Sequence, residues 1–86
     1  MTLKQLRRRI DGVDAQLLRL LNRRASFALR VGALKKRQGR RLFDPRRERA
    51  ILRRMSHANH GPLTAAAVQA IYREVLRQIR RLEHSA

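Results

Sequence analysis

The first forty residues carry one helical pattern that is too long for a chain of this size to bury by itself. Apolar residues recur every three or four positions on one side of the pattern: Leu3, Leu6, Ile10, Val13, Leu17, Leu20, Leu21, Ala28 and Val31. No proline interrupts it, and Gly12 and Gly32 each cost only about 1 kcal/mol relative to alanine. A helix of about 37 residues, from about Thr2 to about Arg40, would be about 55 Å long. In a chain of 86 residues, we expect later helices and a second copy of the chain to cover it.

The rest of the chain carries two shorter helical patterns. Asp44 is a favoured N-cap and Pro45 a favoured first helical residue, so we expect a second helix from about Pro45 to His57. Residues 59–62 have the composition of a turn. Thr64 is expected to cap a third helix that runs to about His84. The sequence therefore predicts one all-α domain over residues 1–86, built from a long, a short and a medium helix.

The net charge of the chain is extreme. There are 22 Lys and Arg residues, nineteen of them arginine, against 6 Asp and Glu, which gives a formal charge of +16. Such a balance favours binding to polyanions and keeps an arginine-rich helical nucleic-acid-binding protein as an alternative. However, the basic residues lie on several helix faces, and only Phe27, Phe43 and Tyr72 could stack on bases. No recognised nucleic-acid-binding motif is present, so we expect non-specific polyanion binding and no specific nucleic-acid partner.

The composition also limits how the chain can be stabilised and in which cellular compartment we expect it. There is no cysteine, so neither a disulfide nor a thiolate metal site can stabilise this small chain. The N-terminal residues are polar and basic, and no apolar run approaches the length of a membrane span. We therefore expect a cytoplasmic protein with no membrane partner.

Two cations lie on the apolar stripe of the first segment. The same spacing places Arg24 between Leu20 and Ala28, and Lys35 after Val31. Eleven residues apart, they would differ by only about 20° around a helix and by about 16 Å along it. A cation on a core-facing stripe is costly unless an anion meets it, or unless its charged end reaches water along apolar surface. Six acids cannot neutralise 22 cations, so we expect a buried basic cluster to take an external anion.

Further polar residues lie on or beside the apolar stripes. They are Arg7, Asp44, Arg47, Glu48 and Glu83. Arg47 and Glu48 each precede an apolar residue of the second helix by four positions, and Glu83 continues the apolar stripe of the third. Asp44 is a helix cap in either case, whereas the others could equally be solvated or paired at the surface.

The position of Arg7 predicts a site shared between two chains. Arg7 would lie about 25 Å along the helix axis from Arg24 and about 100° around it. It therefore cannot reach the Arg24 site from the same straight helix, but an antiparallel partner helix could bring in the partner's Arg7. We expect a composite site across a two-fold interface.

Five segments match the pattern of a known family. They are Leu6–Asp14, Leu17–Arg24, Val31–Lys35, Asp44–Arg49 and Ile71–Glu83. In these segments, which span nearly the whole chain, it resembles the all-helical (AroQ-type) chorismate mutases. The resemblance implies a homodimer of three-helix chains with intertwined long helices. It also implies an isomerase that rearranges chorismate to prephenate in phenylalanine and tyrosine biosynthesis, with no metal or cofactor.

The resemblance also implies roles for the polar residues. Arg24 and the partner's Arg7 would hold the two carboxylates of the substrate. Lys35 would donate a hydrogen bond to the ether oxygen of the breaking bond and contact a carboxylate. Glu48 and the region of Asp44 would take the ring hydroxyl.

The remaining implied site residues are Arg47, Ile79 and Glu83. Arg47 would help order the carboxylate end of the substrate, and Ile79 stands where some members have a serine near a carboxylate. Glu83 stands where the family often has a glutamine that donates to the ether oxygen. Only a protonated glutamate can donate, and burial would raise its pKa while nearby cations would lower it. The closest alternative is isochorismate-pyruvate lyase activity on the same scaffold.

Overall fold

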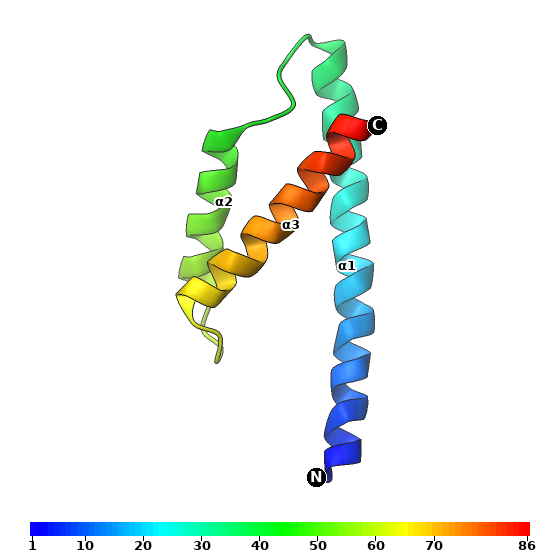
Figure 1. Ribbon diagram of the computed structural model, residues 1–86, viewed down its shortest axis with the longest axis vertical. Helices are drawn as coiled ribbons and strands as arrows, with labels where there is room; N and C mark the ends of the chain where they lie inside the picture. The colour runs from blue at the N-terminus through cyan, green and yellow to red at the C-terminus, as the bar shows by residue number, and fades with distance from the viewer.

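The computed structural model describes residues 1–86 and contains three helices and no strand. They are α1 (Leu3–Arg37), α2 (Pro45–Ala58) and α3 (Ala65–Ser85) (Figure 1). The predicted all-α class and the order of long, short and medium helices are thus confirmed. The expected ends of the second and third helices, at His57 and His84, each fall one residue short of the observed ends.

The end of α1 corrects one prediction. The helix stops at Arg37 and not at about Arg40. Gly39 has a φ of +67°, and the Arg40 amide donates to the Lys35 carbonyl at 2.9 Å while the Gly39 amide donates to the Lys36 carbonyl at 3.2 Å. This is a Schellman ending, in which a left-handed residue, most often glycine, turns the chain and satisfies the last carbonyls.

Side-chain caps start all three helices. The Asp44 carboxylate accepts from the Arg47 amide at 3.0 Å, and the Thr64 hydroxyl accepts from the Ala67 amide at 3.1 Å, as the sequence predicts. At α1, Thr2 and Gln5 form a reciprocal capping box with hydrogen bonds of 2.8 and 3.1 Å. Each cap satisfies an amide that has no partner within its helix, which explains why the helices begin where they do.

The third helix holds the molecule together. It packs against α2 along one side and against the C-terminal half of α1 along the other, whereas α1 and α2 do not pack on each other (Figure 1). The four buried apolar side chains all come from α2 and α3: Ile51, Val68, Leu76 and Ile79. The core is therefore small, and the N-terminal half of α1 extends away from it within a molecule 55 Å long.

Most of the apolar stripe on α1 has no cover within the chain. Gly32 is the one buried residue of the helix, and Ile10, Val13 and Leu17 are 58%, 59% and 51% exposed. An exposed apolar row of this length marks an interaction surface. None of the three helices combines the length and the apolar character that crossing a bilayer requires.

Candidate functional site

A cavity of about 310 Å³ lies where the three helices and the segment 38–44 meet. Fifteen residues line it: Arg24, Phe27, Ala28, Val31, Lys35, Leu42, Asp44, Arg47, Glu48, Ile51, Arg54, Leu76, Ile79, Arg80 and Glu83. Seven of the eight residues singled out from the sequence are among them, and Arg7 is the exception. The structure thus brings together polar residues from all three helices, whose roles remain predictions.

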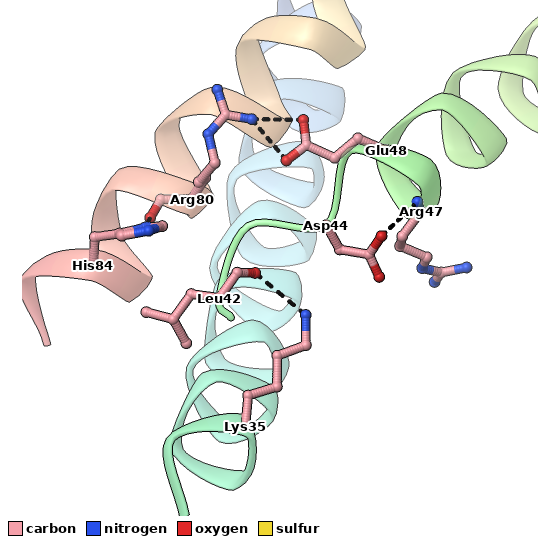
Figure 2. Close-up of polar contacts among 7 residues, drawn as sticks. All are labelled: Lys35, Leu42, Asp44, Arg47, Glu48, Arg80 and His84. Atoms are coloured by element: carbon pink, nitrogen blue, oxygen red, sulfur yellow. Dashed lines mark hydrogen bonds and ion pairs between the residues drawn. The ribbon is translucent and has the colours of Figure 1, made fainter. Parts of the chain in front are cut away.

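The α1 wall of the cavity carries Arg24 and Lys35, both half-buried. Their spacing of three helical turns places them on one face, as expected from the sequence. The Lys35 ammonium donates to the Leu42 carbonyl at 3.2 Å, so it lies against the segment that leads into α2 (Figure 2). An ammonium has three donors, so two remain for other partners.

The start of α2 forms the opposite wall. Asp44 is half-buried and uses Oδ1 to cap the helix through the Arg47 amide, so its carboxylate is held at the cavity edge (Figure 2). The side chain of Arg47 is exposed and lines the cavity. Arg54 lies two helical turns beyond Arg47 and also lines it. Arg54 was not predicted, although its seven-residue spacing from Arg47 places both on one face of the helix.

Glu48 is paired with a residue that the sequence analysis missed. Arg80 reaches from α3, and its Nη1 donates to both carboxylate oxygens of Glu48 at 2.6 and 2.7 Å (Figure 2). The Arg80 guanidinium also lies over the Phe43 ring, with its central carbon 4.7 Å from the ring centre. A signal was present, because Arg80 follows the buried Leu76 by four residues and so interrupts the apolar stripe of α3.

Glu83 enters the cavity from the end of α3 and lies against Gly32 of α1. A Cβ on Gly32 would be 3.4 Å from Glu83 Oε2, at the edge of ordinary van der Waals contact, so α1 and the Glu83 side chain approach closely there. Burial raises the pKa of Glu83 above its ordinary value of 4.5, against the opposing effect of the nearby basic side chains Lys35, His84 and Arg24. Of the two opposing effects that the sequence left open, burial is therefore the larger, and the pKa of Glu83 is shifted in the direction that favours the protonated, donating form.

Most of the cations in the cavity have no carboxylate partner. Arg80 is paired with Glu48, whereas Arg24, Lys35, Arg47 and Arg54 form no ion pair. Unpaired cations gathered in one concave, partly apolar site attract an anion. No group of His, Asp and Glu side chains that could hold a metal ion occurs in the chain.

Arg7 lies outside the cavity of its own chain. It is exposed near the free end of α1, where it borders a shallow surface with its close neighbours Leu3, Lys4, Arg8 and Asp11. Within one chain, Arg7 therefore does not join the other site residues, in keeping with the distance along the helix.

Comparisons with known proteins agree on one family. The family model described as chorismate mutase type II matches residues 6–84. A bifunctional chorismate mutase/prephenate dehydratase of Neisseria gonorrhoeae is 44% identical over 70 residues, which cover 81% of this chain and 19% of the relative. The protein with the same description in Aquifex aeolicus is 38% identical over 78 residues, covering 86% of this chain and 22% of the relative. The chain thus spans about a fifth of the length of these relatives.

Solved structures show the same fold. Chorismate mutase (Form II) from Thermus thermophilus superposes with a TM-score of 0.94 at 28% identity, covering 95% of this chain and 93% of that chain. Chorismate mutase from Helicobacter pylori in complex with prephenate superposes with a TM-score of 0.88 at 31% identity, covering 96% of this chain and 90% of that chain.

Proposed function

The chain belongs to the chorismate mutase type II family, and we propose that it rearranges chorismate to prephenate. The observation that carries this proposal is the set of unpaired cations around one cavity, headed by Arg24 and Lys35. Chorismate is a dicarboxylate, and these cations supply the charge that its binding requires. The relative from Helicobacter pylori, whose structure contains prephenate, has the same fold.

The chemistry needs little beyond binding and electrostatics. A pericyclic rearrangement breaks a carbon–oxygen bond and forms a carbon–carbon bond within one molecule, without a nucleophile or an obligatory proton transfer. Catalysis then comes from holding the reactive conformer and from donors aimed at the oxygen that gains negative charge. Lys35 and Glu83 are the two donors that we assign to this ether oxygen. The raised pKa of Glu83 supports its use as a neutral acid.

The remaining residues bind the ends of the substrate. We assign the two carboxylates of the substrate to Arg24 and to Arg7 of the partner subunit, and Arg47 further orders the carboxylate end. Glu48 accepts a hydrogen bond from the ring hydroxyl beside Asp44. Ile79 offers only apolar contact, because its side chain has no hydrogen-bonding group.

Assembly as a homodimer is the second part of the proposal. It is supported by the exposed apolar stripe of α1 and by the distance of Arg7 from its own cavity. In an antiparallel pair of α1 helices, each stripe is covered and each Arg7 meets the cavity of the other chain. The cytoplasmic location expected from the sequence stays a prediction.

The activity is tested by incubating the purified protein with chorismate. The expected result is a loss of chorismate absorbance with prephenate as the product. In a parallel incubation with isochorismate, release of pyruvate would instead support the lyase alternative. A folded protein with no turnover of chorismate would contradict the proposal.

The shared site is tested by complementation. Arg7→Ala and Lys35→Ala should each be nearly inactive alone, but after unfolding together and refolding they should form mixed dimers. One of the two sites in each mixed dimer then has both residues intact, so an equal mixture should recover about a quarter of the parent activity. If Arg7 acted within its own chain, no mixed dimer would have an intact site and no activity would return.

A further inference from the structure

We propose that Arg80 is a positioning residue, which holds the Glu48 carboxylate toward the ring hydroxyl of the substrate and away from the cations that bind its carboxylates. The inference rests on the proposed function, because it concerns how Glu48 is made available to that substrate. Three observations carry it: the double contact with Glu48, the stacking on Phe43, and the unpaired cations across the cavity.

The contact between Arg80 and Glu48 differs from an ordinary surface ion pair. It joins α3 to α2 across 32 residues of sequence, and the two side chains are only 31% and 24% exposed. The other ion pair of the chain, between Arg77 and Glu74, is of similar length at 2.7 Å but lies within α3, with side chains 58% and 52% exposed. Water screens the exposed pair much more strongly, so the Arg80 contact restrains its partner and the Arg77 contact does not.

Arg80 is itself held from a second side. Its guanidinium stacks on Phe43, which immediately precedes Asp44 in the segment that supplies the Leu42 carbonyl to Lys35. One planar cation therefore links α3, the start of α2 and the connecting segment on a single side of the cavity. Such a stacked guanidinium has little freedom left, which makes it a firm anchor for the carboxylate.

The restraint on Glu48 has a chemical consequence. Each carboxylate oxygen accepts from Arg80 and keeps a lone pair, so Glu48 can still accept a hydrogen bond from a hydroxyl. Without Arg80, the flexible Glu48 side chain is free to turn toward Arg24 and Lys35, which have no carboxylate partner. It would then compete with the carboxylates of the substrate, and the main loss would be in substrate binding.

The test compares Arg80→Met with the matched control Arg77→Met. Both remove an ion-paired arginine from α3, but only Arg80 lines the cavity. We expect Arg80→Met to raise KM for chorismate roughly tenfold and to change kcat by less than about twofold. A tenfold rise in KM is the size of effect expected when binding loses one hydrogen bond to a charged group. Arg77→Met should leave both constants as in the parent. Equal kinetics for the two variants would overturn the role of Arg80.

Further variants distinguish a positioning role of Arg80 from direct contact with the substrate and from a loss of folding. In a Glu48→Gln background, Arg80→Met should have little further effect on KM, because Arg80 acts through Glu48. A full tenfold effect in that background would overturn the proposal and make Arg80 a direct ligand of the substrate. Arg80→Lys, which keeps the charge but loses the planar stacking group, should show a smaller rise in KM and decides the case if Arg80→Met does not fold. A parent without turnover would refute the proposed function itself, whereas an active parent with unaffected Arg80 variants would refute only this inference.

Discussion

The two halves of α1 share one sequence pattern but have different surroundings. From Leu3 to Leu20 every residue is exposed, including the whole apolar stripe. From Leu21 onward, α3 covers part of the helix (Figure 1). In this half Arg24 and Lys35 are half-buried and Gly32 is buried. In the first half, the apolar side chains have no other helix covering them. In the second half, the cations of the cavity have no carboxylate partner.

This difference separates two requirements of the molecule. Exposed apolar surface is stabilised by another protein surface, because burial removes it from water. Unpaired cations in a cavity are stabilised by an anionic ligand, because opposite charges attract each other more strongly where water is partly excluded. One helix thus carries both the surface that we propose a second chain covers and a wall of the cavity that we propose binds the ligand.

The largest effect is expected at the C-terminal half of α1, which lines the cavity. Lys35→Ala should lower kcat for chorismate by about 10²–10³-fold, since it removes one of the two donors that we assign to the oxygen that gains negative charge. Circular dichroism and the molecular mass in solution should be those of the parent, because Lys35 is only half-buried and makes a single side-chain hydrogen bond. Substantial turnover by the variant would show that the reacting oxygen lies elsewhere.

The proposed role of the exposed N-terminal half in dimer formation can be tested with a charge on the apolar stripe. In a lone chain Val13 is 59% exposed, so Val13→Asp should change stability by less than about 0.5 kcal/mol. If a partner covers Val13, the short carboxylate becomes buried, and association should weaken by about 100-fold or more, with loss of activity at low protein concentration.

Ala15→Asp is the matched control. Ala15 lies on the opposite face of α1, and its substitution by aspartate introduces the same charge as Val13→Asp. Its mass in light scattering and its turnover should be those of the parent. A Val13 variant that behaves like the Ala15 variant would contradict the assignment of the stripe to the interface.

A moderate effect is expected from the ionisation of Glu83. Burial raises the pKa of this group, so the protonated donor persists above the ordinary range of a glutamate. Activity should be highest at low pH and fall as pH rises through the raised pKa, and the contribution of Glu83 to the free energy of unfolding should be lost over the same interval.

The measurement is kcat/KM for the parent and Glu83→Gln from about pH 5 to about pH 8.5. The amide cannot ionise, so the variant should lack the decline that Glu83 causes in the parent. Parent and variant profiles of the same shape would show that Glu83 does not act as a neutral acid.

The smallest effect is expected from substitution of the two glycines inside α1, Gly12 and Gly32. Gly12→Ala and Gly32→Ala should each gain up to about 1 kcal/mol in helix propensity. A Cβ at Gly12 meets nothing within 4 Å, whereas one at Gly32 lies 3.4 Å from Glu83 Oε2. We expect Gly32→Ala to lower kcat roughly threefold to tenfold through a small displacement of Glu83. Thermal melts and turnover would check this, and equal turnover in the two variants would remove the positioning role of Gly32.

Much of this molecule follows from the sequence alone. The three helices follow from the apolar period and from Asp44, Pro45 and Thr64, whose effects are local to a helix start. Arg24 and Lys35 share a wall because 11 residues make almost a whole number of helical turns. These results need no knowledge of how one helix lies against another, because they depend only on the geometry within each helix.

The tertiary structure decided the contacts between helices. Arg80 reaches Glu48, and Gly32 lies close to Glu83, only because α3 crosses between α2 and α1 at one particular position. The direction of the pKa shift at Glu83 is likewise decided by the tertiary structure, since that crossing sets the burial of Glu83 and its distances to the cations. The period of a sequence places a side chain around its own helix, but it does not encode the crossing angle and depth at which two helices pack.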